Sequence, residues 1–497
     1  MCQRGGRVVK PIKQLISPRM MEKAKKSDIY ETLKHSKNYF FADIAIKAVG
    51  VISVPIFTRL LTQEDYGIVA VFDAYVGIFL IILSLNSHAA VGRYYYEKTK
   101  DFNEFVGTTL IFMGFIFAFI ALFFISLSKQ IAHIIQLPGL LHIYLVIICL
   151  FGIICEMYIE ILIPQKRSRE IALIRTVRSF ASVATSILLV CLLKENKYLG
   201  RVWASLIIGA IFSVYLMIKI RDYSRFSFRR SHLSYIAHYS FPLVPYALSG
   251  IILAQFDRIM INSTLGTASA GLYSLGYNIG MLLLIVIAST RTALIPDFYR
   301  FLNSREYNRL EILVRRVFSI VTIAALGLFL FAMEIGFILA DEKFHPGLSV
   351  VPIVVIGYVF FGMYSIYSWY VFYEKRTSYL SVVVFPAGVL NIVLNILFIP
   401  KYGYIAAAYT TVVSYFVMFL LMWITANRIC DQRIVPLWII WKPTIIMFLF
   451  IGSFYYLNWL NLHTVVFFIM KLMILVLFST ILFWKEIKIL YSEMFRT

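Results

Sequence analysis

The stretch Pro55-Ile-Phe-Thr-Arg-Leu-Leu-Thr-Gln-Glu-Asp-Tyr-Gly67 separates two long apolar runs, Phe40–Phe57 and Gly67–Val91. About 20 apolar residues are enough for a helix to cross the hydrocarbon core of a membrane. The stretch is therefore predicted to be a tight turn between two membrane-spanning helices. Thr62 and Asp65 have the spacing of a capping box, which predicts that the second helix begins at this point.

The composition of the whole chain agrees with a membrane protein. Of its 497 residues, 60% are hydrophobic and only 15% are charged, whereas about 25% are charged in a soluble domain. The net charge of +21 would suggest a nucleic-acid partner in a soluble chain, but here the basic residues lie between apolar runs. That pattern follows the positive-inside rule, so no nucleic-acid partner is expected. The five Cys and eight His residues show no disulfide or metal-site spacing, and no metal or cofactor is expected.

The apolar runs predict an all-α polytopic fold with about fourteen transmembrane helices. The predicted spans are 40–57, 67–91, 106–128, 141–163, 179–193, 202–218, 240–261, 268–294, 317–340, 349–373, 379–399, 404–426, 443–460 and 463–484. Alternate connectors carry 36 of the 47 Lys and Arg residues, and the other connectors carry 7. This bias predicts that both termini are cytosolic.

A faint repeat relates the two halves of the chain. Leu61–Ser84 can be laid without gaps on Leu265–Ala288, an offset that pairs Gly67 with Gly271 and moves the second helix onto the eighth. Because six spans separate the two, both halves share one orientation and are predicted to be related by a pseudo-two-fold axis along the membrane normal. Coincidence between apolar segments remains the alternative.

The predicted organisation is two six-helix lobes followed by an extra helix pair. The segments are a basic cytosolic segment (1–39), an N-lobe (40–218), a cytosolic linker (219–239), a C-lobe (240–426), helices 13 and 14 (427–484) and a cytosolic tail (485–497). Two connectors, 165–178 and 297–316, mix Arg with apolar residues at helical spacing and are predicted to be surface-lying helices.

Charged residues inside the spans are the candidates for function, since each costs roughly 2.5–3.5 kcal/mol at mid-membrane. Lys47, Arg258 and Arg291 lie in helices 1, 7 and 8, within the repeated hairpins. They predict a cationic cavity between the lobes that would bind a diphosphate. Three other interpretations stay open: Arg291 snorkels to the interface, and Asp43–Lys47 and Asp257–Arg258 are structural pairs. Two further charges, Glu334 and Lys471, are expected to be isolated, and Lys471, in the extra helix pair, is expected to serve packing or an interface.

The opening stretch, with Ala90-Val-Gly-Arg-Tyr-Tyr-Tyr-Glu97, resembles segments of bacterial polysaccharide flippases of the O-antigen translocase (Wzx-like) type. The runs Phe256-Asp-Arg-Ile-Met-Ile and Ala270-Gly-Leu-Tyr-Ser-Leu-Gly-Tyr-Asn-Ile-Gly280 look like the matching segment of the second half. These proteins belong to the multidrug/oligosaccharidyl-lipid/polysaccharide (MOP) exporter superfamily.

The resemblance implies a transporter that is not an enzyme and has no catalytic residues. It would move an undecaprenyl-diphosphate-linked oligosaccharide, such as an O-antigen unit for lipopolysaccharide biosynthesis, across the bacterial inner membrane by alternating access. Its partners would be this glycan and membrane lipid, with polysaccharide polymerase machinery as a further candidate. Arg59 and Arg93 lie in the family-like motifs and become additional candidate ligands, although Arg59 aligns with Ser263 in the repeat. Asp43, Asp73 and Asp257 are the candidate carboxylates for ion coupling.

Two other functions are weighed against a flippase. A multidrug or cation-coupled exporter of the same superfamily would share the fold, but its cavity should be acidic and aromatic because its ligands are often cationic. A membrane-embedded glycan polymerase usually carries a sizeable outer loop, and the predicted outer connectors have at most about a dozen residues. Such connectors are too short for a separate folded domain.

Overall fold

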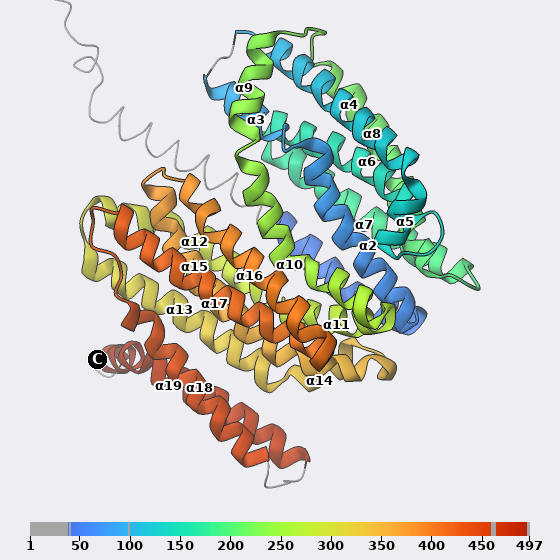
Figure 1. Cartoon of the computed structure of the whole chain (residues 1–497). Helices are drawn as coiled ribbons and strands as arrows, with labels where there is room; N and C mark the ends of the chain where they lie inside the picture. The colour runs from blue at the N-terminus through green and yellow to red at the C-terminus, as the bar shows by residue number, and fades with distance from the viewer. Residues whose placement is uncertain (1–37, 39–40, 98–99, 459–463, 495–497) are drawn as a thin grey trace, which may run out of the picture.

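The computed structural model describes residue 38 and residues 41–97, 100–458 and 464–494, and every element in these ranges is a helix (Figure 1). The predicted basic segment 1–39 therefore lies outside the described residues except for residue 38. Figure 1 shows two groups of helices that diverge at one end and meet where α10 (Leu243–Leu265) and α11 (Thr267–Gly280) lie beside α2 (Gln63–Ser84).

The first group, called the N-lobe here, begins with the helix Phe41–Leu60. Its other helices are α2, α3 (Ala89–Glu97), α4 (Phe102–Ser126), α5 (Ser128–Ile135), α6 (Leu141–Leu162), α7 (Ser168–Leu192) and α8 (Tyr198–Arg221). A short helix, α9 (Arg230–Ser240), leads from this lobe to α10.

The second group, called the C-lobe here, runs from α10 to α17. After α10 and α11 its elements are α12 (Leu283–Asn303), α13 (Tyr307–Leu330), α14 (Ala332–Leu339), the 3₁₀ segment η2 (Glu342–Ser349), α15 (Val350–Tyr373), α16 (Ser378–Tyr402) and α17 (Tyr404–Ile429). A final hairpin, α18 (Leu437–Asn458) and α19 (Thr464–Met494), packs against α13.

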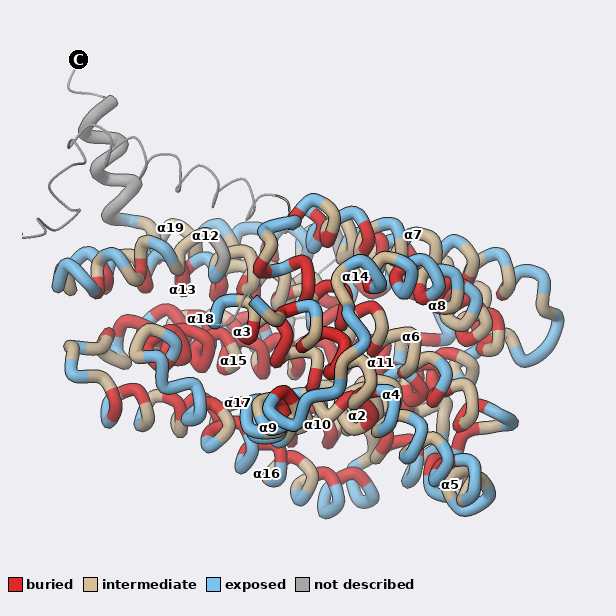
Figure 2. Tube along the Cα trace, turned by 90° about the horizontal axis from the view of Figure 1, so that it is seen from above, coloured by how far each residue is buried: buried red, intermediate tan, exposed pale blue. Residues whose placement is uncertain are grey.

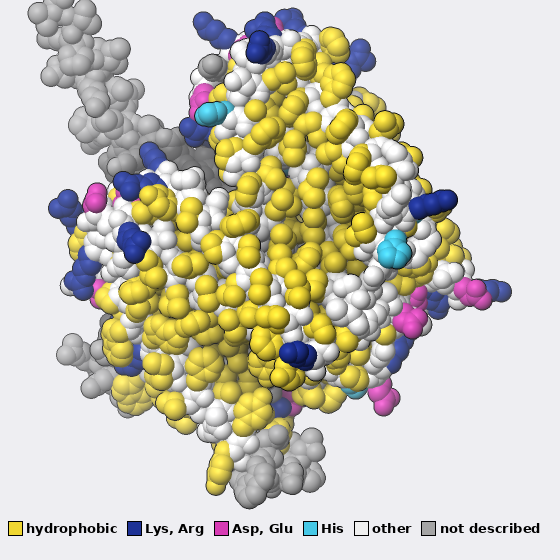
Figure 3. Space-filling model, viewed as in Figure 1, with side chains coloured by type: hydrophobic (Ala, Val, Ile, Leu, Met, Phe, Trp, Pro, Cys, Tyr) yellow, Lys and Arg dark blue, Asp and Glu magenta, His cyan; other side chains and the backbone are white. Residues whose placement is uncertain are grey.

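The number of membrane spans agrees with the prediction. The described residues contain thirteen helices long and apolar enough to cross a membrane, and the pair α11–α12, bent by 40°, makes fourteen when counted as one span. Their outward faces are apolar, as Phe119 (76% exposed) and Leu122 (71%) on α4 illustrate, and Figure 3 shows such side chains covering a broad flank. The buried positions gather inside the bundle (Figure 2). Lipid-facing apolar flanks with all backbone groups bonded inside helices are what a bilayer requires.

The predicted start of α2 is confirmed. The Thr62 hydroxyl accepts a hydrogen bond from the backbone N–H of Asp65 at 3.0 Å, and the Asp65 carboxylate accepts one from the backbone N–H of Thr62 at 3.2 Å. This reciprocal pair is the capping box, and it satisfies two helix-terminal donors that otherwise have no partner. The turn between the first helix and α2 is consequently only two residues long.

The predicted surface-lying helices are wrong. α7 begins at Ser168 and runs through the membrane as one helix, and α12 extends to Asn303 before α13 begins at Tyr307. The apolar residues at helical spacing in these segments are the first or last turns of the spans. Arg175 and Arg178, both on α7, line a cavity together with Glu156 of α6.

The prediction that Glu334 and Lys471 are isolated is also wrong. The Lys471 ammonium donates to the Glu334 carboxylate at 2.6 Å, joining α19 to α14. Three aromatic rings surround the ammonium with centroids 4.8–5.8 Å away, those of Phe331, Phe454 and Phe467. The C-terminal hairpin is therefore fixed to the C-lobe by a charged pair within an aromatic cage.

Candidate functional site

The two lobes meet backbone to backbone at the end where α2 and α11 begin, called the Gly67 end here. A β-carbon on Gly67 would lie 1.8 Å from the carbonyl oxygen of Thr267, and one on Gly271 would lie 2.2 Å from that of Gln63. The two contacts are equivalent under the 204-residue repeat, since Gln63 corresponds to Thr267 and Gly67 to Gly271. The equivalent helices of the two halves thus contact each other reciprocally, at a distance that only glycine allows.

The segment η2 of the C-lobe covers this contact. The Tyr66 and Phe344 rings pack edge to face with centroids 5.4 Å apart. The Gln63 side-chain amide donates to the carbonyl of Lys343, and the backbone N–H of Asp341 donates to the Thr58 hydroxyl at 3.3 Å. The stretch from Pro55 to Gly67 is therefore the N-lobe's half of a closed interface between the lobes.

A cavity of about 310 Å³ lies between the lobes, beside this closed interface. Its polar lining comes mainly from Lys47 and Tyr66 of the N-lobe, Arg201 of α8 and Asn278 of α11. The rest is chiefly apolar, with Val51, Val54, Phe57, Ile279, Leu282, Leu284 and Ile285. No Asp or Glu is among the lining residues that the structure describes, so the fixed charge of this cavity is positive.

Arg201 is a cavity residue that the sequence reasoning missed. The predicted spans 179–193 and 202–218 place Arg201 in the connector between them, but α8 begins at Tyr198 and carries Arg201 within its first turns. Its guanidinium lies over the Phe57 ring, 4.7 Å from the centroid. Arg201 also lines a smaller cavity of about 50 Å³ together with Asp73. Asp73 is thus enclosed by protein yet accessible through this cavity, and both Arg201 and Arg258 attract its carboxylate electrostatically.

Arg258 lies behind the wall of the main cavity, with 4% of its surface exposed. Its guanidinium donates to the Ala254 carbonyl at 2.8 Å and approaches the Asn278 side-chain oxygen at 3.5 Å. It also lies over the Tyr277 ring, 4.7 Å from the centroid. The amide of Asn278 donates to the Tyr66 hydroxyl at 3.3 Å, which links this arginine to the cavity lining.

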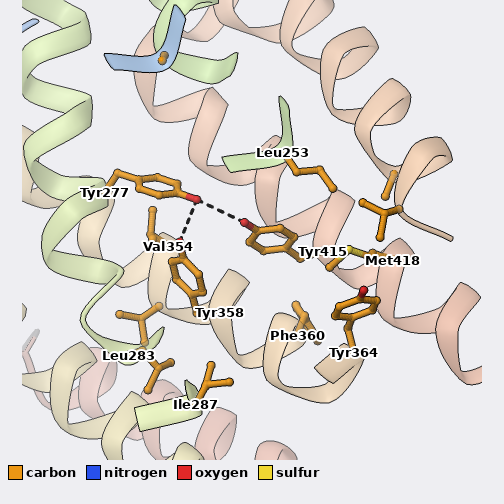
Figure 4. Packing of buried hydrophobic residues seen from close by; sticks show 14 of the residues in the cluster. Leu253, Tyr277, Leu283, Ile287, Val354, Tyr358, Phe360, Tyr364, Tyr415 and Met418 are labelled. Carbon is orange, nitrogen blue, oxygen red and sulfur yellow. Dashed lines mark hydrogen bonds between the residues drawn. The ribbon is translucent and has the colours of Figure 1, made fainter. Parts of the chain in front are cut away.

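The Tyr277 ring is held in place by tyrosines of two other C-lobe helices. Its hydroxyl accepts a hydrogen bond from Tyr358 at 3.2 Å and lies 3.4 Å from the hydroxyl of Tyr415 (Figure 4). All three tyrosines are buried and come from three different helices. The platform under Arg258 is therefore rigid, which favours a cation–π contact with a fixed geometry.

Asp257 faces away from Arg258, into the C-lobe. Its fully buried carboxylate accepts hydrogen bonds from Tyr273 at 2.5 Å, Asn395 at 2.6 Å and Thr411 at 2.7 Å. Among the described residues no ion pair joins Asp257 to Arg258, because adjacent residues of a helix point in different directions. The interpretation of these two residues as a structural ion pair is therefore wrong.

The other predicted residues are distributed more widely. Asp43 is exposed, and within the described ranges no ion pair joins it to Lys47, so their interpretation as a structural pair is also wrong. Arg59 is exposed at the end of the first helix. Arg93 pairs with Glu97 at 2.6 Å. Arg291 is exposed and lies over Phe372, 5.8 Å from the ring centroid.

Lys47, Arg258 and Arg291 are consequently not brought together in one cavity. Lys47 lines the main cavity, Arg258 lies behind its wall, and Arg291 contacts a ring at the far end of α15. The cavity pairs Lys47 with Arg201 instead. Within the ranges that the structure describes, no group of three or more His, Cys, Asp or Glu side chains could hold a metal ion.

The linker between the lobes is docked on the N-lobe. His232, at the start of α9, contacts the Asp101 carboxylate at 3.1 Å and the Thr108 hydroxyl at 3.2 Å. The backbone N–H of Arg225 donates to the carbonyl of Asn103 at 2.8 Å. Burial raises the pKa of Asp101, but hydrogen bonds from His232 and Tyr94 outweigh it and lower the pKa below its ordinary value. α9 is therefore fastened to the lobe that precedes it.

Comparison with known proteins gives a family and a fold. A model of the family described as "Polysaccharide biosynthesis protein" matches residues 34–302. "Lsg locus putative protein 1" of Haemophilus influenzae is 23% identical over 407 residues, which cover 78% of this chain and 98% of that relative. An uncharacterized membrane protein of Methanocaldococcus jannaschii is 22% identical over 384 residues, covering 73% of this chain and 90% of the relative.

Solved structures share the arrangement of helices. The lipid II flippase MurJ in an inward closed conformation aligns with a TM-score of 0.69 and 16% identity, over 92% of this chain and all of that chain. A MOP-superfamily transporter from Pyrococcus furiosus aligns with a TM-score of 0.57 and 13% identity, over 80% of this chain and 95% of the other. At such identities the likeness establishes the fold alone.

Proposed function

The chain belongs to the polysaccharide biosynthesis protein family and has the fold of MOP-superfamily transporters, and from this premise we propose that it is a flippase for a polyprenyl-diphosphate-linked oligosaccharide. The observation that carries the proposal is the charge of the cavity between the lobes. Lys47 and Arg201 face into it, and no carboxylate is among its described lining residues.

A diphosphate suits this cavity because its oxygens accept charge-assisted hydrogen bonds, and a guanidinium can donate two of them in parallel. Arg258 adds a third positive charge behind the wall, at the Asn278 side of the cavity. The largely apolar remainder of the lining lowers the local dielectric, which strengthens these interactions. The multidrug-exporter alternative fits less well, since a cationic ligand would meet two cations and no described carboxylate.

Transport would follow from rocking of the lobes about this cavity. The contact at Gly67 and Gly271 would be the closed outer gate, and the opposite end would open toward the cytosol. The Lys and Arg distribution supports this orientation, with both termini cytosolic in the inner membrane of a bacterium. The cargo would be an O-antigen or other surface polysaccharide unit, received in the cytosolic leaflet and released for polymerase machinery on the outer side.

Ion coupling would use a carboxylate of the described bundle, and Asp257 is the best placed of the three candidates. Its carboxylate is held by three donors from α11, α16 and α17 inside the C-lobe. A cation or proton taken up there would change the packing of α10, the helix that also carries Arg258. Asp73 is a second candidate because it attracts Arg201 and Arg258, whereas Asp43 is exposed on the first helix.

The proposal is tested by pyrophosphate binding to the full chain in lipid nanodiscs. Lys47→Ala and Arg201→Ala should each weaken binding about tenfold, since a charge-assisted hydrogen bond contributes roughly 1.5–3 kcal/mol. Lys194→Ala, an exposed lysine in the connector before α8, is the matched control. Equal affinities for all four proteins would refute the diphosphate site. In cells, a deletion strain should accumulate lipid-linked repeat units on the cytosolic leaflet and show unchanged sensitivity to cationic dyes.

A further inference from the structure

A second cavity, of about 650 Å³, lies at the end of the bundle opposite Gly67. It is lined from both lobes, with α3 and α9 on one side and the turn between α15 and α16 on the other. The lining residues are Arg93, Glu97, Tyr235, His238, Tyr239, Phe372, Lys375 and Thr377. Its volume is within the range of about 300–1,000 Å³ that is usual for ligand sites.

Aromatic faces of both lobes border this cavity. Tyr235 and Tyr239 lie one turn apart on α9 with ring planes 15° from parallel and centroids 6.3 Å apart. The Tyr235 hydroxyl donates to the Glu97 carboxylate at 2.8 Å, which fixes that ring. Tyr239 and Phe372 are each 37% exposed. These rings line a cavity between the lobes, which distinguishes them from aromatic side chains that anchor a helix at a lipid interface.

Polar groups alternate with these rings. Glu97 offers acceptor oxygens, Thr377 offers a hydroxyl, and Lys375 offers an ammonium that has no ion pair among the described residues. Arg93 is paired with Glu97, so its charge is largely compensated. The cavity therefore presents flat apolar faces beside both donors and acceptors, and Glu97 lowers the net positive charge that Arg93 and Lys375 would otherwise give it.

The chemistry of this lining selects among the parts of a lipid-linked glycan. A polyprenyl chain needs a continuous apolar groove, and a diphosphate would meet the Glu97 carboxylate. A sugar ring has one face of C–H groups, whose slight positive polarisation suits the negative face of an aromatic ring. Its hydroxyls both donate and accept hydrogen bonds, as Glu97, Thr377 and Lys375 require.

We propose that this cavity binds a sugar ring of the transported glycan, between the tyrosines of α9 and Phe372 of α15. The proposal rests on the proposed flippase function and adds a carbohydrate subsite separate from the diphosphate site at Lys47 and Arg201. The tyrosines belong to α9, which is docked on the N-lobe, and Phe372 belongs to the C-lobe. The sugar ring is therefore contacted from both sides only while the two lobes lie as they do in this structure. The Arg291 guanidinium also contacts Phe372, 5.8 Å from its ring centroid.

The test uses two probes on the full chain in nanodiscs. One is the oligosaccharide released by mild acid from the host's lipid-linked repeat unit, which has neither lipid nor diphosphate, and the other is inorganic pyrophosphate. Tyr239→Ala and Phe372→Ala should each weaken oligosaccharide binding at least tenfold and leave pyrophosphate binding unchanged. Tyr239→Phe keeps the ring and should bind like the wild type. Phe385→Ala removes an exposed aromatic side chain of α16 and is the control.

Each outcome decides between the two proposals. A wild-type protein that does not bind the oligosaccharide, or alanine variants that bind it unchanged, would overturn the carbohydrate subsite. If Tyr239→Ala and Phe372→Ala weaken oligosaccharide binding while Lys47→Ala and Arg201→Ala leave pyrophosphate binding unchanged, the carbohydrate subsite is supported and the diphosphate site is refuted. Thermal unfolding of each variant checks that it is folded, and either alanine variant alone is sufficient for the test if the other does not fold.

Discussion

Gly67 and Gly271, 204 residues apart, each occupy a position where the opposite helix leaves no space for a β-carbon. Each faces the backbone of the residue that opens the partner's first turn, Thr267 for Gly67 and Gln63 for Gly271. A backbone cannot move aside as a flexible side chain can. The closeness of the two lobes at this end therefore depends on the absence of two side chains.

Gly67→Ala should open the Gly67 end. The added methyl group would meet the Thr267 carbonyl at 1.8 Å, and overpacking of this kind costs about 1–3 kcal/mol, enough to shift the population of the closed form about 5- to 150-fold. Spin labels on α2 and α11 should report a longer distance at this end, and the proposed export of glycan should fall. Gly114→Ala, where a β-carbon meets nothing within 4 Å, is the control. An unchanged distance distribution would show that the glycine contact does not determine closure.

Lys471→Met should lower the midpoint of thermal unfolding by leaving the Glu334 carboxylate without its partner. The lysine is buried while the glutamate side chain is 33% exposed, so we expect a loss of about 2 kcal/mol, less than the roughly 3–5 kcal/mol of a fully buried pair. The double variant Lys471→Met with Glu334→Gln should recover part of the loss. Lys442→Met, at an exposed lysine over Trp438, is the comparison. Additive effects in the double variant would contradict a coupled pair.

Asp101→Asn should loosen the docked linker. The Asp101 carboxylate accepts hydrogen bonds from Tyr94 and His232, and Arg229 approaches it at 3.9 Å. Removing the charge weakens all three contacts, and we expect the free energy that holds the linker on the N-lobe to fall by about 1–3 kcal/mol. Proteolysis within residues 222–229 should become faster. Asp222→Asn changes an exposed aspartate at the end of α8 and should be cleaved at the wild-type rate. Equal cleavage rates for the two variants would show that Asp101 does not hold the linker on the N-lobe.

Acidification should destabilise the turn between α2 and α3 through His88. Burial lowers the pKa of His88 to about 4, so the unfolded chain, with a pKa near 6.5, binds a proton first as the pH falls. The contribution of neutral His88 to the free energy of unfolding is thus complete above pH 6.5 and is lost as the pH falls toward 4. Since His88 is partly accessible, we expect the free energy of unfolding to fall by about 1 kcal/mol between pH 7 and pH 5. His88→Gln should show a smaller fall in its unfolding midpoint over this interval than the wild type.

The sequence predicts most of the fold because helix length and hydropathy are local properties. The spans, the Thr62–Asp65 capping box and the pairing of Gly67 with Gly271 all follow from nearby residues or a fixed offset. Contacts between distant helices do not follow from such signals. Lys471 and Glu334 are 137 residues apart, and nothing local relates them.

The site was harder to predict for the same reason. Hydropathy alone locates the start of α8 only to within a few residues, so it predicts Arg201 in a connector. The direction of the Arg201 side chain is set by its packing against Phe57. Arg258 was correctly placed inside the bundle, but only the folded chain separates its surroundings from those of Asp257. A positive charge within an apolar run does not indicate which cavity it reaches, and Arg291 shows that such a residue need not be buried.

The docking of α9 limits how the two lobes can rotate relative to each other. Since α9 is fastened to the N-lobe through His232 and ends at Ser240, and α10 begins at Leu243, any rotation between them is confined to Phe241 and Pro242. One residue inserted here would turn α10 about its axis by about 100°. That turn would carry Arg258 off the Tyr277 ring unless the rest of the C-lobe turned together with α10. The length of this joint therefore fixes the rotation of α10, and of the helices packed on it, relative to the N-lobe.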